Sequence, residues 1–310
     1  MKKMDKDVIY VPLQGRIGNQ LFQYAIARRI QIEKGKNAKI IMDDSDVLRC
    51  KWENSLAYYN LPNVEYVHDS ITKKTFVFSH QAILRNIYKV LTKYMNYKSK
   101  FAFEKKIQFF INKLGVALCE NGYIDFDLDY SKPIYLEGYF QSEKYFKNYY
   151  FDIKNIITDN FHDQLNEYPE IDKIRRRNTV CISVKIEHNV GNSIFSVCGI
   201  DYWKKAIEYI MKNVENPLFF ICSDNVSYVL DNLIDTNKYD YVVQDKNSPV
   251  FLSLAAMAEC KHFIIGNTTF GWWAQYLSEF ENKMVIAPSK WMAIDMPIDI
   301  YQNNWILIEV

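Results

Sequence analysis

The second half of the chain alternates short apolar runs with longer stretches of helical periodicity, and this alternation restricts the possible folds more than any other feature. The apolar runs, which we interpret as strands, cover residues 180–186, 218–222, 241–244, 263–265 and 284–287. The stretches with helical periodicity cover residues 202–212, 226–233, 250–259 and 270–280. Strands and helices that alternate at this spacing are typical of βαβ units, in which helices cover both faces of a parallel sheet. The sequence therefore predicts an α/β fold.

The first half shows the same order of elements less regularly. We expect strands at 8–13, 38–42 and 134–137, and helices at 21–33, near 80–96 and at 102–114. Ser142 is a candidate cap for a helix that runs from Glu143 toward Tyr150. The chain has 310 residues, which is long enough for two domains. We place their junction in the polar segment 165–178, so the expected domains are residues 1–165 and 166–310.

The charge balance gives no support for a nucleic-acid partner. Lys and Arg total 38 and Asp and Glu total 37, so the net charge is +1 and the chain has no overall basic field. No apolar run approaches the roughly 20 residues that span a bilayer, and the first residues do not resemble a signal peptide. The six cysteines form no C-x-x-C pair, and we interpret them as reduced, buried packing residues. These features predict a cytoplasmic location.

Residues 85–115 carry Lys and Arg interleaved with Ile, Leu, Tyr and Phe. This pattern has two interpretations, which are peripheral contact with a membrane surface and a solvated helix with one buried face.

Polar side chains follow the ends of several predicted strands. Ligands of an open parallel sheet bind beyond the carboxyl ends of its strands, so these side chains are candidates for a site. They are Lys185, Glu187 and His188 at the end of the run 180–186, and Ser223, Asp224, Asn267, Thr268 and Thr269 at the ends of two others. Part of this pattern reflects helix capping, which favours the same residue types. The helix that begins near Thr269 also offers backbone N–H groups to a phosphate oxygen.

A loop with two glycines, Gly15-Arg16-Ile17-Gly18-Asn19-Gln20, follows the first expected strand and precedes the first expected helix. Backbone amides in such a loop can face an anion. The loop lacks the Lys-Ser/Thr ending of a Walker motif and the three-glycine spacing of a dinucleotide motif. A ligand-binding loop and a plain tight turn therefore both remain open.

Several segments occur in an order that is typical of one protein family. The first, Gly15-Arg-Ile-Gly-Asn-Gln-Leu-Phe-Gln-Tyr-Ala25, is similar to an opening G-x-L-G-N-Q-M-F-Q-Y-A. The others are Glu137-Gly-Tyr-Phe-Gln-Ser142, Phe219-Phe-Ile-Cys-Ser-Asp224, Asn267-Thr-Thr-Phe-Gly-Trp-Trp273, Ala287-Pro-Ser-Lys-Trp291 and Tyr301-Gln-Asn-Asn-Trp305. Together, from residue 8 to 308, they resemble glycosyltransferase family 11, the α-1,2-fucosyltransferases.

The resemblance implies two facing Rossmann-like domains of the GT-B type, with parallel sheets covered by helices and a cleft between the domains. It implies an inverting transfer of L-fucose from GDP-fucose to a galactoside hydroxyl, without a metal or a further cofactor. The five His are scattered through the sequence, which agrees with a metal-free site. Bacterial members of the family further imply a role in surface polysaccharide or O-antigen assembly.

The resemblance also implies roles for individual residues. Asn19, with its loop neighbours Arg16, Gly18 and Gln20, would face the donor's sugar or phosphates from the N-terminal, acceptor-side domain. The residues that would lie around the nucleotide in the C-terminal domain are Ser223, Asp224, Asn267, Thr268 and Thr269.

One segment departs from the family. Its members carry H-x-R-R-x-D after the first strand of the second domain, where arginine neutralises the leaving diphosphate. Here Lys185 stands for the histidine and Val190 for the aspartate, while Glu187 and His188 replace the two arginines. Lys185, Glu187 and His188 therefore join Asn19 as candidate catalytic residues, and Glu187 and His188 are candidates for the base.

This departure leaves three interpretations open. In the first, Lys185, His188 and Arg16 together supply the missing positive charge. In the second, the donor is another nucleotide sugar, and Glu187 binds a hydroxyl or amine of it. In the third, the chain binds sugars or nucleotides without transferring a sugar.

Overall fold

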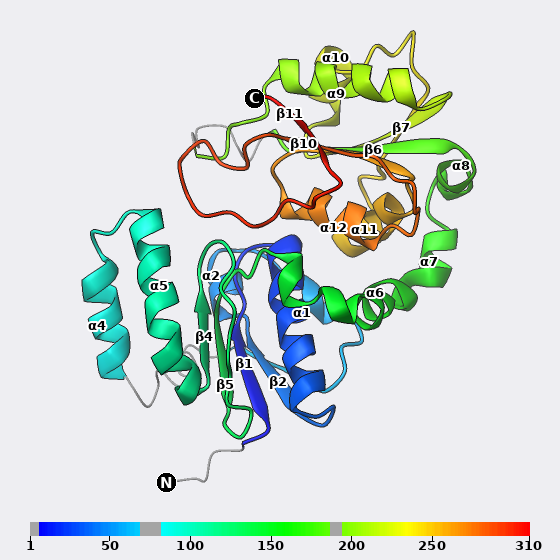
Figure 1. Cartoon of the computed structure of the whole chain (residues 1–310). Helices are drawn as coiled ribbons and strands as arrows, with labels where there is room; N and C mark the ends of the chain where they lie inside the picture. Colours follow the sequence, from blue (N-terminus) through cyan, green and yellow to red (C-terminus); the bar gives the residue numbers. More distant parts are fainter. Residues whose placement is uncertain (1–5, 69–81, 187–193) are drawn as a thin grey trace. The chain divides into compact units, whose positions relative to one another are not determined.

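The computed structural model describes residues 6–68, 82–186 and 194–310 (Figure 1). The chain divides into two compact units, which are Met1–Ile157 with Asp295–Ile300, and Thr158–Ile294 with Tyr301–Val310. Each unit contains one sheet, and all paired strands in both sheets are parallel. The expected α/β class, with parallel sheets covered by helices, is confirmed.

The sheet of the first unit has the strand order β3-β2-β1-β5-β4. Its strands are β1 (Val8–Pro12), β2 (Lys39–Asp43), β3 (Val64–Val67), β4 (Val116–Cys119) and β5 (Ile134–Gly138). The chain adds β2 and β3 on one side of β1, and places β5 and β4 on the other side. The direction of growth therefore reverses between β1 and β5. Ligands of open parallel sheets bind at such a reversal, beyond the carboxyl ends of the strands.

Helices cover both faces of this sheet. The helical segments are α1 (Ile17–Lys34), α2 (Ser45–Arg49), η1 (Ser55–Tyr58), α4 (Ala82–Thr92), α5 (Tyr97–Ile111), η3 (Asn112–Leu114), η4 (Glu143–Tyr145), η5 (Lys147–Tyr149) and α6 (Tyr150–Thr158). Helix α5 packs against β4, where Ile111 joins a buried cluster with Leu118 and Tyr135. Helix α1 packs against β1 and β2 on the other face (Figure 1).

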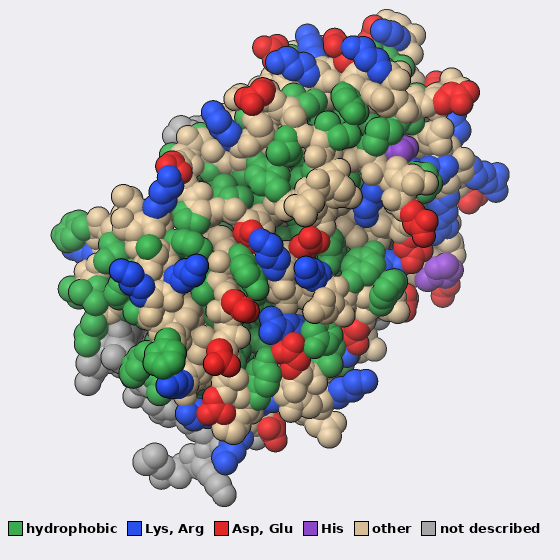
Figure 2. Space-filling view, viewed as in Figure 1, with side chains coloured by type: hydrophobic (Ala, Val, Ile, Leu, Met, Phe, Trp, Pro, Cys, Tyr) green, Lys and Arg blue, Asp and Glu red, His purple; other side chains and the backbone are tan. Residues whose placement is uncertain are grey.

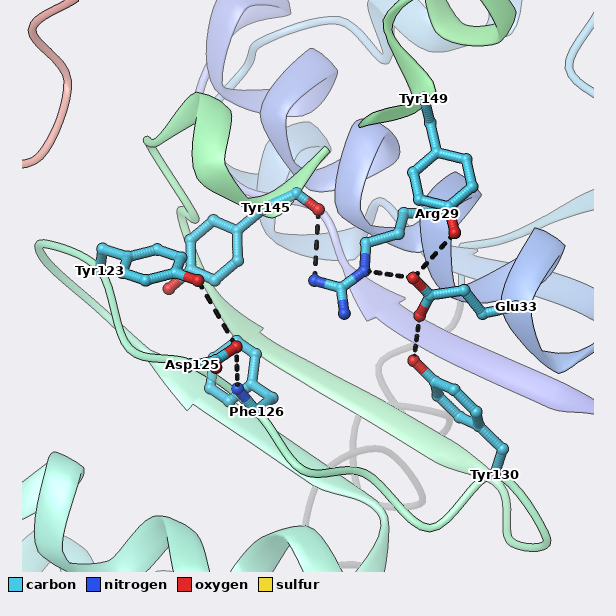
Figure 3. Close-up of polar contacts among 8 residues, drawn as sticks. All are labelled: Arg29, Glu33, Tyr123, Asp125, Phe126, Tyr130, Tyr145 and Tyr149. Atoms are coloured by element: carbon cyan, nitrogen blue, oxygen red, sulfur yellow. Dashed lines mark hydrogen bonds and ion pairs between the residues drawn. The ribbon is translucent and has the colours of Figure 1, made fainter. Parts of the chain in front are cut away.

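Hydrogen bonds around Glu33 fix the outer side of α1 (Figure 3). Glu33 Oε1 accepts from Arg29 Nε at 2.9 Å and from the Tyr149 hydroxyl at 3.0 Å. Glu33 Oε2 accepts from the Tyr130 hydroxyl, and Arg29 also donates to the backbone carbonyl of Tyr145 at 3.3 Å. Partial burial alone would raise the pKa of Glu33, but these hydrogen bonds hold it below its usual value. The network ties α1 to two segments that lie far from it in sequence.

The sheet of the second unit has the strand order β11-β10-β9-β6-β7-β8. Its strands are β6 (Asn178–Val184), β7 (Pro217–Ser223), β8 (Tyr241–Val243), β9 (His262–Ile265), β10 (Val285–Pro288) and β11 (Ile306–Ile308). This is the strand order of doubly wound dinucleotide-binding sheets. The direction of growth reverses between β6 and β9, so this sheet also offers a binding position at its carboxyl edge.

The helices of the second unit lie on both faces of its sheet (Figure 1). They are η6 (Asp159–Phe161), α7 (His162–Asn166), α8 (Ile171–Arg176), α9 (Ile200–Asn213), α10 (Val226–Asn232), α11 (Val250–Ala258) and α12 (Thr269–Leu277). Because successive strand side chains point to opposite faces, Val180 and Ile182 join the core with α9, whereas Ser183 faces α12. A Cβ on Gly271 of α12 would lie 3.0 Å from Ser183 Oγ, so glycine permits close packing there.

Three predicted elements in the first unit differ from the structure. The helix expected at 102–114 begins earlier, because α5 covers Tyr97–Ile111. Helix α1 begins at Ile17, so the last part of the predicted loop 15–20 is the first turn of the helix. The helix expected from Glu143 toward Tyr150 is replaced by the short turns η4 and η5, because Phe146 between them has a φ of −147°, outside the helical range. Ser142 still acts as a cap, since its Oγ accepts from the N–H of Lys144 at 3.2 Å.

The interpretation of all six cysteines as buried is wrong for one of them. Cys119, Cys181, Cys222 and Cys260 are buried, and Cys198 is half-buried. Cys50 is exposed, because it directly follows the short helix α2 in a turn at the surface.

Gly138, the last residue of β5, gives a test of the strand packing. Its φ is +137°, and a Cβ there would lie 1.8 Å from the carbonyl oxygen of Cys119 in β4. Neither strand can shift without disturbing the ladder, so we expect Gly138→Ala to lower the free energy of unfolding by about 3 kcal/mol or more. Urea denaturation followed by circular dichroism measures this change.

The matched control is Gly199→Ala at the N-cap of α9, where an added Cβ has no atom within 4 Å. We expect the free energy of unfolding of the control to fall by about 1 kcal/mol or less. Equal losses for the two variants would contradict the packing argument.

Candidate functional site

The loop after β1 brings Asn19 to the reversal point of the first sheet. Gly15 has a φ of +72°, and a Cβ there would lie 2.3 Å from Asn19 Nδ2, so a glycine is required for this approach. Asn19 Oδ1 accepts a hydrogen bond from Gln141 Nε2 at 2.9 Å. Because Gln141 follows β5, the Asn19 side chain links the beginning of α1 to the segment beyond that strand.

Gln20 lies in the same turn of α1, but its side chain is fully buried. Its Nε2 donates to the carbonyl oxygens of Gly15 at 2.9 Å and Glu53 at 3.0 Å. Its Oε1 accepts from the N–H of Ser55 at 2.9 Å. The carboxamide of Gln20 therefore supports the shape of the loop.

Arg16 and Gly18 complete this loop. Arg16 is exposed and lies with its guanidinium carbon 5.9 Å from the centroid of the Trp52 ring. Its carbonyl accepts from the N–H groups of Asn19 at 2.9 Å and Gln20 at 3.0 Å, which closes the first turn. Gly18 is buried in that turn. An exposed guanidinium beside the amino end of a helix is a favourable place for an anion.

Gln23 is absent from the predicted site residues, yet it joins the strands at this edge. Its Nε2 donates to the carbonyl oxygens of Pro12 at 3.2 Å and Gly138 at 2.9 Å. Its Oε1 accepts from the N–H of Gln14 at 3.0 Å, and the residue is only 1% exposed. The sequence feature that could have identified Gln23 is a polar residue among apolar neighbours in a helix that is otherwise buried.

A cavity of about 180 Å³ lies at the reversal point of the second sheet. Its lining residues are Lys185, Ile186, Ser196, Cys198, Trp203, Gly266, Asn267 and Thr268. Lys185 directly follows β6, and Gly266 directly follows β9. The cavity therefore occupies the position that the strand order favours for a ligand.

The electrostatics of this cavity favour an anion. Thr268 is the N-cap of α12, and its Oγ1 accepts from the N–H of Gly271 at 3.2 Å. The amino end of a helix carries a partial positive charge, and Lys185, a basic residue, also lines the cavity. Burial raises the pKa of the Cys198 thiol to about 12, so this lining group contributes no negative charge near neutral pH.

Two predicted donor-binding residues hold the walls of the cavity. Asp224 Oδ1 accepts from the N–H of Ile186 at 2.7 Å, which fixes the backbone beside Lys185. Asn267 Nδ2 donates to the carbonyl oxygens of Phe195 at 2.9 Å and Trp291 at 3.0 Å. Both side chains therefore position segments around the cavity.

The structure thus separates the predicted site residues into groups. Lys185, Asn267 and Thr268 line one cavity, and Thr269 is the first residue of the helix beside it. Ser223 ends the neighbouring strand β7, where its Oγ accepts from the N–H of Asn225 at 3.0 Å. Glu187 and His188 lie outside the described residues. The residues of the loop after β1 belong to the first unit.

Within residues 6–68, 82–186 and 194–310, no three side chains of His, Cys, Asp or Glu form a group that could hold a metal ion. In the same part of the chain, no helix has both the length and the apolar character needed to cross a bilayer.

Comparison with known proteins extends the sequence resemblance. The profile of glycosyl transferase family 11 matches residues 8–309. The chain is 26% identical to the O-antigen biosynthesis glycosyltransferase WbnK of Escherichia coli, over 96% of this chain and 99% of that protein. It is 23% identical to an alpha-1,2-colitosyltransferase of Escherichia coli, over 97% of this chain and 99% of that protein. Among solved structures, the fucosyltransferase NodZ from Bradyrhizobium superposes with a TM-score of 0.49 and 10% identity, over 89% of this chain and 93% of that chain.

Replacing Gln23 by leucine tests whether its carboxamide holds the strand ends. Gln23→Leu leaves two buried carbonyl groups and one N–H group without this partner. We expect the free energy of unfolding to fall by about 2–4 kcal/mol, as measured by urea denaturation.

Gln275→Leu is the matched control. Gln275 is equally buried, but its Nε2 makes one hydrogen bond, to the Trp272 carbonyl at 3.0 Å, and its Oε1 has no partner among the described residues. The free energy of unfolding of the control should fall by about 1 kcal/mol or less. A larger loss in the control than in Gln23→Leu would refute the role of Gln23.

Proposed function

The chain belongs to glycosyl transferase family 11, and on that premise we propose that it transfers L-fucose from GDP-fucose to a hydroxyl group of a galactoside. As a member of this family the chain is a fucosyltransferase-like glycosyltransferase, and the family implies that it binds a nucleotide-sugar donor. Inversion at the anomeric carbon, independence of metal ions and a role in surface polysaccharide or O-antigen assembly belong to the proposal. The similarity to WbnK, an O-antigen biosynthesis glycosyltransferase, supports the last point.

One observation carries the proposal, which is that Lys185 and the N-cap of α12 line the same cavity. A departing nucleoside diphosphate gains negative charge in the transition state, and stabilising that charge usually contributes more to catalysis than any other effect. The ammonium group and the helix terminus both act on such a charge. Lysine acts as a point charge, whereas the arginine of the family motif makes a two-pronged contact with phosphate.

The proposed reaction is a single displacement. The acceptor hydroxyl oxygen forms a bond to the anomeric carbon while the bond from that carbon to the β-phosphate oxygen breaks. The electron pair of the broken bond leaves with GDP, and the hydroxyl proton passes to a base. Glu187 and His188, outside the described residues, remain our candidates for the base.

The remaining site residues have supporting roles in the proposal. Asn19 and Arg16 contact the sugar or the phosphates of the donor, while Gly18 and Gln20 shape their loop. The residues assigned to the nucleotide, either through contact or by holding the cavity wall, are Ser223, Asp224, Asn267, Thr268 and Thr269.

A different donor is the second candidate. The relative that is 23% identical is named an alpha-1,2-colitosyltransferase, so a protein similar to 97% of this chain is named for a sugar other than fucose. Glu187 in place of an arginine adds a group that would repel a diphosphate but would accept a hydrogen bond from a sugar hydroxyl or amine.

A donor screen tests the proposed function. Calorimetry with GDP and UDP measures nucleotide binding, and incubation with GDP-fucose and lactose, followed by mass spectrometry and NMR, identifies the product and its anomeric configuration. A fucosylated product together with GDP release supports the proposal. Binding of GDP without turnover across a panel of nucleotide sugars, including the activated colitose, would instead establish a binding protein.

Replacing Lys185 tests the charge argument. With the donor identified by the screen, we expect Lys185→Ala to lower kcat about 100-fold, because the leaving diphosphate loses its cation. Lys185→Arg should retain most of the activity, since the positive charge is kept. Lys212→Ala is the control, because Lys212 is exposed in the last turn of α9 and does not line the cavity. An unchanged kcat for Lys185→Ala would remove this residue from the mechanism.

A further inference from the structure

Helix α4 exposes the apolar stripe that an amphipathic helix ordinarily buries. Ile87, Val90, Leu91 and Tyr94 follow the spacing i, i+3, i+4 and i+7, so they share one side of α4 and its continuation. All four are exposed, with Val90 at 73% and Tyr94 at 87%. Another side of the helix meets α5, where the Tyr88 hydroxyl donates to Glu104 Oε1 at 2.6 Å. The apolar stripe is therefore left without a covering element among the described residues.

Helix α5 adds exposed aromatic residues to the same helical pair. Phe109 is 77% exposed, and Tyr97 and Phe110 are also exposed. Single exposed hydrophobic residues are ordinary, whereas a group of them on neighbouring elements marks an interaction surface. We call these seven residues, from Ile87 to Phe110, the α4–α5 patch.

The α4–α5 segment is also strongly basic. Between residues 86 and 114 the lysines are Lys89, Lys93, Lys98, Lys100, Lys105, Lys106 and Lys113, and Glu104 is the one acidic residue. The segment therefore carries +6 (7 − 1), and the rest of the chain carries −5, because the total is +1. Glu104 is buried against Tyr88, so its carboxylate does not offset the lysines at the surface.

Two lysines lie directly beside exposed rings. Lys93 Nζ is 5.1 Å from the centroid of the Tyr94 ring, and Lys113 Nζ is 4.0 Å from that of Phe109. Figure 2 shows hydrophobic and basic side chains together over the region where α4 and α5 lie. Two other lysines pair with carboxylates of the first unit, Lys98 with Asp295 and Lys100 with Glu120. Lys105 and Lys106 are exposed on α5.

We propose that the α4–α5 patch docks the protein on an anionic membrane surface. Apolar side chains of a surface-bound helix enter the boundary between headgroups and acyl chains, while lysine stems extend so that the ammonium groups meet lipid phosphates. The patch provides both kinds of group on the same pair of helices. A nucleic-acid partner would use the lysines but would leave the aliphatic residues of α4 exposed to water. This inference concerns where the enzyme works and does not depend on the identity of the donor.

Vesicle sedimentation with the full chain tests the proposal. The probes are vesicles of phosphatidylcholine with about 30% phosphatidylglycerol, and vesicles of phosphatidylcholine alone. We expect binding to the anionic vesicles that is at least tenfold stronger than to the neutral ones and that weakens in 0.5 M NaCl, because salt screens the lysines. No binding to anionic vesicles, or equal binding to both kinds, would overturn the proposal.

Matched variants separate the patch from general surface character. We expect the double variant Val90→Ser with Tyr94→Ser to lower the vesicle partition coefficient about tenfold. Phe151→Ser is the control, because Phe151 is 74% exposed on α6, outside the α4–α5 patch. This control should leave the vesicle partition coefficient unchanged. We expect Lys105→Glu with Lys106→Glu to lower binding about 30-fold or more, while Lys204→Glu with Lys205→Glu on α9 leaves it unchanged.

Two further measurements make the result decisive. Transfer to a water-soluble acceptor should be unchanged in the Val90 and Tyr94 double variant, so failure of the proposed function and failure of membrane docking remain distinguishable. Analytical ultracentrifugation of the chain without vesicles tests whether a second copy of the chain covers the patch instead. A dimer that the double variant dissociates, combined with no vesicle binding, would assign the patch to contact between copies of this chain.

Discussion

Polar side chains that hold the backbone beyond the carboxyl ends of parallel strands are the constraint on which both candidate sites depend. Backbone groups at the end of a strand leave the ladder and need new partners if they are buried. In the first unit, Gln20 and Gln23 provide these partners from inside α1. In the second unit, the exposed Asp224 and the half-buried Asn267 hydrogen-bond to backbone groups around the cavity. Each site can therefore keep its shape before a ligand is bound.

This arrangement distinguishes residues that shape a site from residues that can act on a ligand. The carboxamides of Gln20 and Gln23 use their hydrogen-bonding capacity on the protein itself. Arg16 is exposed beside them, and Lys185 lines a cavity whose other positive contribution is the start of α12. In each unit a basic side chain thus lies next to a backbone that other side chains hold, which is the arrangement that the proposed stabilisation of a leaving diphosphate requires.

The central strands could be predicted from the sequence because they are buried on both faces and read as continuous apolar runs. The strands β3, β4 and β11, which were not predicted, all lie at the edges of their sheets. Edge strands make a ladder on one side only, and β3 is partly exposed and carries Glu65, so its sequence resembles that of a loop. The start of α1 was predicted too late because Gly18 and Asn19 are weak helix formers on their own, and tertiary contacts overrode that preference.

The candidate site was predictable to a lesser degree than the fold. The position of polar residues after strand ends located Lys185, Asn267 and Thr268 at one edge, since that follows from topology alone. Whether an amide such as that of Asn267 touches a ligand or a carbonyl group of the chain depends on loop conformation, which residue type and spacing do not encode. Gln23 illustrates the opposite case, because a polar residue inside a buried helical stripe indicates a partner without indicating which one.

The segment Asp295–Ile300 gives the chain an interleaved construction, because it belongs to the first unit while the residues on both sides of it belong to the second. Within the first unit, Asp299 accepts from Ser142 Oγ at 2.5 Å and from Lys144 Nζ at 2.6 Å. A fragment that stops at Ile157 would lack this carboxylate. Chimaeras between relatives would have to exchange the amino-terminal half and this short carboxyl-terminal piece together, because neither carries the complete set of contacts by itself.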